Sequence, residues 1–184
     1  AAHRGKYPDN RAGGLTADPA LFFNSSIHDY DNARWLLGDE AVEVTAIANR
    51  IIAPTSATEI GTDVAVTTIK FKGGAIGDIE NVSSTHYGYD VRTEVIGDRG
   101  TLFIGGLEKT ATILATESGF QRDISDHWLV RFGTTYLIEL EDWVRRTLSS
   151  EASFCSGEDG RAALKIAMAA IESFQAGHSI SIEN

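Results

Sequence analysis

The sequence contains 184 residues, enough for one domain with its own hydrophobic core. Hydrophobic residues make up 42% of it and charged residues 23%, which are ordinary values for a globular protein. The formal net charge of -10 repels phosphate backbones, so we expect no nucleic-acid partner. No apolar run approaches the length of a membrane span, and we expect no membrane anchor. The single cysteine, Cys155, can form no internal disulfide and the N-terminal residues lack the apolar core of a signal peptide, so we expect a cytoplasmic location.

The first predicted element is a helix within residues 18–38. Asp18 before Pro19 is a helix-start signal, and Gly38 after two leucines is a stop signal. In the second half of this segment, apolar residues recur near helical spacing: Phe23, Ile27, Tyr30 and Leu37. The residues before it are polar and typical of a loop.

The middle of the chain has the pattern of β-strands, in which apolar and polar residues alternate. Such runs occur at 42–46, on either side of a Gly73-Gly74 turn, at 91–96, at 101–104 and at 109–118. Glycine-containing turns between alternating runs are typical of hairpins. Because the alternation leaves each strand with one polar face, it favours an antiparallel sheet.

The C-terminal third is predicted to be helical. Apolar residues form one stripe along 128–146 and another along 161–175, and a short closing strand follows Gly177. Strands segregated from helices indicate the α+β class, here an open, mainly antiparallel sheet with both C-terminal helices on one face. The uncovered face of such a sheet favours pairing with a second copy of the chain.

The first candidate site is the polar cluster in the predicted N-terminal helix. In an α-helix, Asn24, His28, Asp31 and Trp35 lie nearly on one line at the border of the apolar stripe. A histidine in that place can accept or donate a proton at neutral pH, and Asn24 can hydrogen-bond its ring. A structural histidine, bonded to a neighbouring carbonyl or to Asp31, fits the same pattern and is the commoner situation.

The second candidate site is the sequence THYGYD, Thr85 to Asp90. Its side chains combine hydroxyl groups with aromatic surface, as a polyol site requires, and Gly88 permits a bulge or a close backbone approach. Two tyrosines that pack across neighbouring strands are the alternative explanation.

Other chemistries lack their motifs. The histidines have no HxxH or HExxH spacing and the lone cysteine gives no CxxC, so we expect no metal site. A G-x-S-x-G elbow, a P-loop and a G-x-G-x-x-G turn are absent from the sequence. We therefore expect no cofactor-binding residues for a dinucleotide in this chain.

The segment NSSIHDYDNARWLLGDEAVEV resembles the glucose–fructose oxidoreductase / inositol dehydrogenase / MocA family, and more narrowly its inositol 2-dehydrogenase branch. The sequences YGYD and EVIGDRGT, and the pattern W..RF...Y..EL.DWV from Trp128 onward, are also similar to that branch. The similarity extends over nearly the whole chain.

The resemblance implies a two-domain dehydrogenase that uses NAD or NADP. Residues 1–184 would form the substrate-binding and oligomerisation domain. The Rossmann domain and the lysine of its E-K-P motif would lie outside this sequence, so the chain alone is expected to be inactive. The open sheet face would join copies into a dimer or tetramer.

The resemblance also implies roles for particular residues. His28 would take the proton from a hydroxyl of an inositol or a related sugar or polyol, and Asn24 stands where the family has an orienting aspartate. An amide can orient the ring, but it cannot stabilise an imidazolium by charge. Tyr87, His3 and Arg4 would line the substrate pocket. The alternative is a non-catalytic binding or assembly module that retains the sheet for dimerisation.

Overall fold

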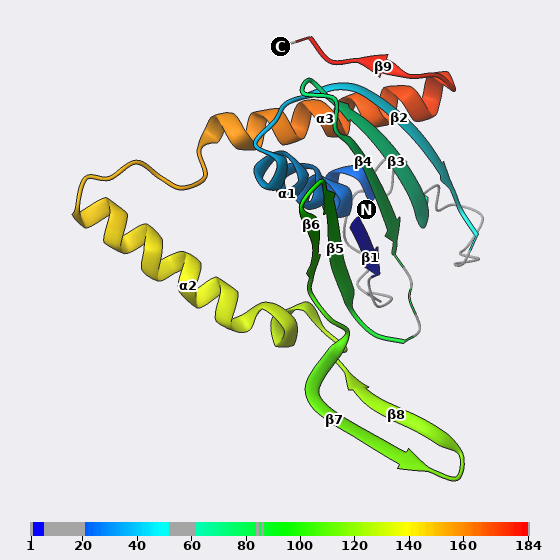
Figure 1. The fold of residues 1–184 in the computed structure, drawn as a ribbon. Coiled ribbons are helices and arrows are strands. Elements are labelled where there is room, and N and C mark those ends of the chain that lie inside the picture. The colour runs from blue at the N-terminus through cyan, green and yellow to red at the C-terminus, as the bar shows by residue number, and fades with distance from the viewer. Residues whose placement is uncertain (1, 6–20, 52–61, 84, 86, 184) are drawn as a thin grey trace, which may run out of the picture.

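The computed structural model describes residues 2–5, 21–51, 62–83, 85 and 87–183. An open sheet carries helices on one face, as expected for the α+β class (Figure 1). In chain order the elements are β1 (Ala2–Gly5), the π-helical turn η1 (Phe22–Ser26), α1 (Ile27–Leu37), β2 (Ala41–Asn49), β3 (Val64–Phe71), β4 (Ile76–Val82), β5 (Asp90–Gly97), β6 (Gly100–Ile104), β7 (Glu108–Thr116), β8 (Gly119–Ile124), α2 (Trp128–Leu148), α3 (Gly157–Ala176) and β9 (Ile180–Ser181).

Among the described residues, seven strands form the main sheet in the order β6-β5-β1-β4-β3-β2-β9. Its pairs are antiparallel except β1 with β4, so the prediction of a mainly antiparallel sheet is confirmed. The predicted hairpins at the Gly73-Gly74 turn and at the GDRG turn are present as β3–β4 and β5–β6. The sequence pattern missed β1, which lies in the centre of the sheet, and β8.

One face of the sheet is apolar and covered. On β3, alternate side chains point inward and are buried, namely Ala65, Thr67, Ile69 and Phe71. They meet α1 and α3, and with Phe22, Val44, Ile79 and Ile166 they form the hydrophobic core. The helices are held to the strands by buried polar contacts as well, because the Ala46 backbone N–H donates to Ser173 Oγ at 3.0 Å.

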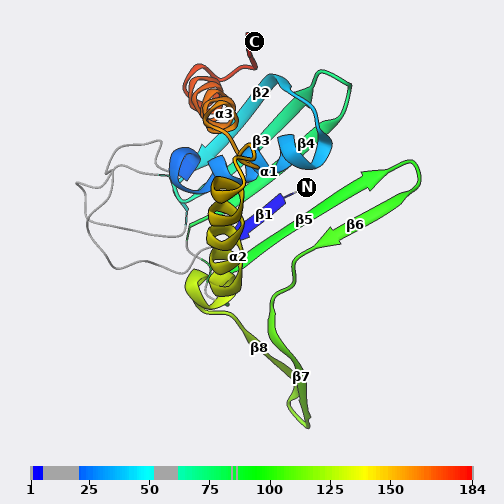
Figure 2. The same ribbon diagram turned by 90° about the vertical axis from the view of Figure 1, so that its left-hand side faces the viewer.

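The long helix α2 does not cover the sheet, so the prediction for 128–146 is wrong. None of its residues is buried, and it runs away from the sheet toward the start of α3, while the β7–β8 hairpin projects in a different direction (Figures 1 and 2). Only its first turns meet the sheet, where Arg131 Nη2 donates to the Val91 carbonyl at 3.1 Å. An amphipathic stripe predicts that a helix has one apolar face, but it does not identify the surface that this face contacts. Here α1 takes the place on the sheet that α2 was expected to fill.

No helix within the described ranges is both long enough and apolar enough to cross a bilayer.

Candidate functional site

The helix predicted within 18–38 is present over the described residues 21–37, and it changes type just before His28; its predicted start signal, Asp18 before Pro19, lies outside the described residues. Phe22–Ser26 form a π-helical turn and Ile27–Leu37 continue as an α-helix that ends at Gly38, whose φ of 60° is left-handed. A π-turn closes between residues i and i+5, so Asn24 and His28 are not stacked as an α-helix would stack them. Single π-turns inside helices occur often at functional sites.

Burial alternates sharply along this turn. Ser26, Asp29 and Tyr30 are buried, whereas Asn24 and His28 are exposed. The buried side chains of Ser26, Asp29 and Tyr30 therefore fix the helix so that His28 stays at the surface.

His28 lies on the lining of a cavity of about 440 Å³. The other lining residues come from α1, from the loop into β2, and from the first turn of α3 with the loop before it: Asp31, Asn32, Arg34, Trp35, Gly38, Asp39, Glu40, Phe154, Cys155 and Asp159. The exposed Trp35 ring meets Phe154 edge-on at 5.9 Å between centroids. The cavity thus combines an imidazole, carboxylates and an aromatic wall, and its volume is in the range of small-molecule sites.

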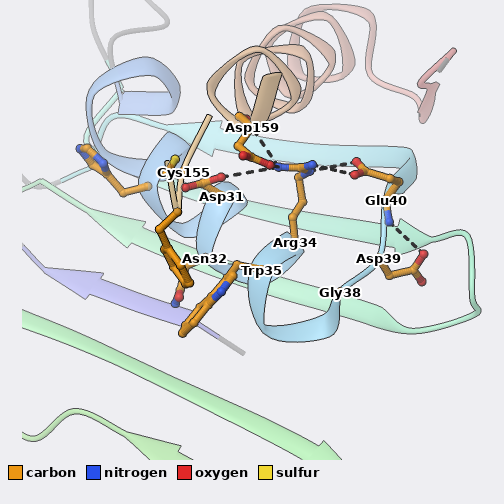
Figure 3. A pocket seen from close by; sticks show the side chains of 11 residues that line it. Asp31, Asn32, Arg34, Trp35, Gly38, Asp39, Glu40, Cys155 and Asp159 are labelled. Atoms are coloured by element: carbon orange, nitrogen blue, oxygen red, sulfur yellow. Dashed lines mark hydrogen bonds and ion pairs between the residues drawn. The ribbon is translucent and has the colours of Figure 1, made fainter. Parts of the chain in front are cut away.

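Arg34 supplies a positive charge to the lining of this cavity, and its guanidinium is paired with carboxylates of the same chain. Its Nε and Nη2 donate to the two carboxylate oxygens of Glu40 at 2.9 and 2.6 Å. Its Nη1 lies 3.5 Å from Asp31 Oδ1 and 3.7 Å from Asp159 Oδ1, and Figure 3 shows the guanidinium between Glu40 on one side and Asp31 and Asp159 on the other. The bonds to Glu40 raise the pKa of Arg34, and the same bonds lower the pKa of Glu40. Arg34 therefore fixes the cavity wall.

The thiol of Cys155 also faces this cavity. Desolvation, followed by the nearby carboxylates of Asp31 and Asp159, raises the pKa of Cys155 above its usual value. A thiol with a raised pKa stays protonated at neutral pH and is a poor nucleophile. The cavity therefore does not favour Cys155 as a nucleophile.

Tyr87 lies outside the residues that line this cavity, in the turn between β4 and β5. Its hydroxyl donates to Asp90 Oδ2 at 2.8 Å. Arg92 also donates to the buried Asp90 carboxylate, through Nε at 2.9 Å and Nη2 at 2.8 Å. Desolvation, reinforced by Asp90, raises the pKa of Tyr87 to about 12. The half-exposed phenol therefore remains protonated, and it can bond a hydroxyl but cannot serve as a base at neutral pH.

Gly88 makes the close backbone approach that its place in THYGYD suggested. Its φ is 138°, and a Cβ there would lie 2.5 Å from Ile124 Cγ2 and 2.9 Å from the Ser125 carbonyl oxygen. The next residue, Tyr89, donates its N–H to that carbonyl at 2.7 Å. The turn that presents Tyr87 is therefore packed against the segment before α2.

The structure brings together His28, Asp31 and Trp35 of the predicted line and leaves Asn24 outside the lining of the cavity. For His3 and Arg4 the description covers the backbone, and β1 pairs His3 with Glu80 and Arg92. Sequence reasoning missed Phe154, Cys155 and Asp159, which reach the cavity from the first turn of α3 and the loop before it, more than a hundred residues downstream of His28. No local pattern signals such a long-range approach.

No group of three or more His, Cys, Asp or Glu within the described ranges could hold a metal ion. Those residues also do not form a dinucleotide cradle. The parallel pair among them, β1 and β4, lies side by side in the sheet, but the antiparallel strands β2 and β3 come between the two in the chain, and no glycine-rich turn within the described ranges leads from a strand into a helix. The described residues therefore do not fit a nicotinamide dinucleotide by themselves.

Comparison with known proteins places this fold in a family. The family model described as "Oxidoreductase family, C-terminal alpha/beta domain" matches residues 11–182, and the chain belongs to this family. It is 34% identical over 164 residues to the myo-inositol 2-dehydrogenase of Thermotoga maritima, covering 89% of this chain and 49% of that protein. It is 32% identical over 163 residues to the scyllo-inositol 2-dehydrogenase (NAD(+)) of Bacillus subtilis, covering 89% of this chain and 48% of that protein.

Solved structures show the same architecture. A putative myo-inositol dehydrogenase from Sinorhizobium meliloti superposes with a TM-score of 0.92 at 28% identity, over 99% of this chain and 56% of that one. The predicted resemblance and fold class are thereby confirmed. The chain spans about half the length of the curated relatives it matches.

Proposed function

We propose that this chain is the substrate-binding domain of a dehydrogenase that oxidises a hydroxyl of an inositol or a related polyol, with His28 as general base. The observation that carries the proposal is the position of His28. Its imidazole is exposed at a cavity of about 440 Å³, while its neighbours Asp29 and Tyr30 are buried. A base must be reachable by substrate and held rigidly, and this arrangement provides both.

The chemistry of the cavity favours a polyol. A cyclic polyol has hydroxyl groups around an apolar ring, and Asp31, Asn32 and Trp35 offer carboxylate, amide and aromatic partners for such a molecule. The named activities of the relatives from Thermotoga maritima and Bacillus subtilis point to the same substrate class. Tyr87, with His3 and Arg4, is proposed to contact the substrate from β1 and the β4–β5 turn.

The hydride acceptor is proposed to be NAD or NADP, which accepts hydride from the carbon that bears the hydroxyl. Because the described residues do not fit a dinucleotide, the contribution of this chain is the proton transfer and the orientation of the polyol. His28 would take the hydroxyl proton, and Asn24 would help to orient the ring or the polyol. The parent protein is further proposed to be a cytoplasmic homo-oligomer.

Kinetics of the full-length protein that carries this domain test the proposal. Oxidation of myo-inositol, scyllo-inositol and glucose is measured with NAD and with NADP. We expect His28→Ala to lower turnover by about 10²–10⁴-fold with little change in melting temperature. His178→Ala is the matched control, because this exposed histidine bonds the Ser179 carbonyl oxygen at the end of α3, away from the cavity.

Three outcomes are decisive. Near-normal turnover of folded His28→Ala rules out His28 as the base. A folded full-length protein with no activity on any polyol favours the assembly-module alternative. Asn24→Asp should leave turnover within a few-fold, and a large increase would show that Asn24 weakens catalysis.

A further inference from the structure

Ser26 and Asp29, which lie on either side of His28 in the chain, both hydrogen-bond the side-chain amide of Asn81. Asn81 lies on β4 at an inward-facing position two residues after the buried Ile79, and it is itself fully buried. Its Nδ2 donates to Asp29 Oδ2 at 3.1 Å. Its Oδ1 accepts a short hydrogen bond from Ser26 Oγ.

These two contacts bracket His28 in the chain. Ser26 is the last residue of the π-turn and Asp29 follows His28 directly in the α-helix. The end of the π-turn and the first turn of the α-helix are therefore both bonded to the same strand residue, Asn81. The turn between them carries the exposed imidazole, so these two contacts restrict the rotation of that turn about the helix axis.

The orientation of the Asn81 amide is dictated by its partners. A carboxylate accepts hydrogen bonds and cannot donate them, so the amide nitrogen must face Asp29. The amide oxygen is then left to face Ser26, whose hydroxyl can donate. A flipped amide would set its oxygen against the Asp29 carboxylate inside the protein, where an unpaired polar contact is costly. The contact is thus directional as well as buried.

We propose that Asn81 is a positioning residue for His28: its side-chain amide fixes the turn that presents the imidazole by bonding Ser26 on one side and Asp29 on the other. This inference rests on the proposed function, because it assigns the proton transfer to His28. Asn81 itself touches neither the cavity nor the reacting atoms.

The test uses Asn81→Asp, a change of nearly equal shape, in the full-length protein. It replaces the donor that faces Asp29 by a second carboxylate, so the pair repels. We expect kcat to fall by about 10- to 100-fold while KM changes by a few-fold, because a small displacement of a catalytic group costs rate more than binding. Thr67→Val is the matched control. Thr67 is equally buried on the neighbouring strand and bonds Tyr30 of the same helix, so this variant should lose stability but keep kcat.

A rescue variant separates the bond from the charge. The exchange Asp29→Asn with Asn81→Asp places the donor on the helix and the carboxylate on the strand, where Ser26 can still donate to it. We expect this double variant to recover most of the lost kcat. A double variant as slow as Asn81→Asp would overturn the proposal, because the loss would then belong to the carboxylate and not to the bond.

A second readout does not depend on activity. NMR spectra of histidine-labelled protein, with the His28 signal assigned by His28→Gln, report the imidazole environment directly. Asn81→Asp should move this signal and Thr67→Val should leave it in place. If His28→Ala retains turnover, the proposed function fails, and the NMR spectra still decide whether Asn81 positions the ring. An unmoved His28 signal together with normal kcat per folded molecule would overturn the positioning role.

Discussion

Tyr30 joins the helix that carries His28 to the middle of the sheet. Its hydroxyl lies 2.9 Å from Thr67 Oγ1, and both side chains are buried. Burial raises the pKa of Tyr30 to about 12 from 10.0. Because the folded-state pKa is the higher one, the protonated phenol contributes stability that is fully present below pH 10 and is lost as the pH rises through about 12.

In the variant Tyr30→Phe, the free energy of unfolding should therefore decrease less steeply with pH in the alkaline range. Two pKa units correspond to about 2.7 kcal/mol, which sets the upper size of the effect. Urea unfolding of both proteins, at pH values from about 8 to 12, measures it. At neutral pH the variant should be less stable by about 1–3 kcal/mol, because it leaves the buried Thr67 hydroxyl without Tyr30. Equal alkaline slopes in the two proteins would contradict the assignment to Tyr30.

At the same scale, the sequence predicted the exposed groups better than the buried polar ones. A histidine beside an apolar stripe is visible in the sequence, so His28 could be named as a candidate, and the structure exposes it at the cavity. Asn81 and Ser26 were not, because their roles depend on a helix and a strand that are more than fifty residues apart in the chain. The available signal was a polar residue at an inward position of a strand, two residues after Ile79.

Among the elements, the turn that presents Tyr87 depends on Gly88. An alanine there must adopt a φ of 138° and place its Cβ within 2.5 Å of Ile124 Cγ2. We expect Gly88→Ala to lower the free energy of unfolding by about 2–4 kcal/mol, the sum of backbone strain and overpacking. Gly119→Ala is the control, because Gly119 also has a positive φ of 116° but a Cβ there meets nothing within 4 Å. Thermal and urea unfolding measure both variants, and equal losses would show that the contact with Ile124 is unimportant.

The prediction of helices and strands succeeded where burial imposes a regular pattern on the sequence, and it failed where burial imposes none. Alternation located most of the strands of the main sheet, because one face of inner strands such as β3 is buried on the helices. The stripe along α2 was read correctly as helix, but its placement on the sheet was wrong. β8, with the sequence GFQRDI, has exposed residues on both faces of an isolated hairpin, so burial imposes no alternation on it. The π-turn before His28 has no signature in the sequence at all.

At the scale of the whole molecule, the fold makes a prediction about the cofactor. The described residues provide no dinucleotide cradle, and the net charge of -10 disfavours a pyrophosphate. We expect titration calorimetry of the 184-residue chain with NADH and NADPH to show no binding at millimolar ligand. Micromolar binding would mean that this chain holds the cofactor and would overturn its assignment as a substrate domain.

The uncovered face of the sheet sets the last prediction. The registers place Ile47 beside Val66 on this face and Phe103 beside Glu94, while Ile69 and Ile79 point to the helices. Ile47 is 72% exposed and Phe103 is 78% exposed, and charged residues such as Lys70 and Glu80 lie among them. A face with apolar groups at its middle and edge, and charges of both signs between, suits pairing with its own copy about a two-fold axis.

We therefore expect the 184-residue chain to be at least a dimer at micromolar concentration, as measured by light scattering behind a sizing column. Val66→Lys should convert it to a monomer with unchanged circular dichroism, because a two-fold contact brings the added charge close to its own copy. Val130→Lys is the matched control, since this valine is also exposed but lies on α2 and not on a strand of the sheet. A wild-type chain that is monomeric and folded would show that the charges of this face outweigh its apolar residues. Loss of the dimer in Val130→Lys alone would place the contact on α2, whose apolar stripe is the other large surface that the described residues leave uncovered.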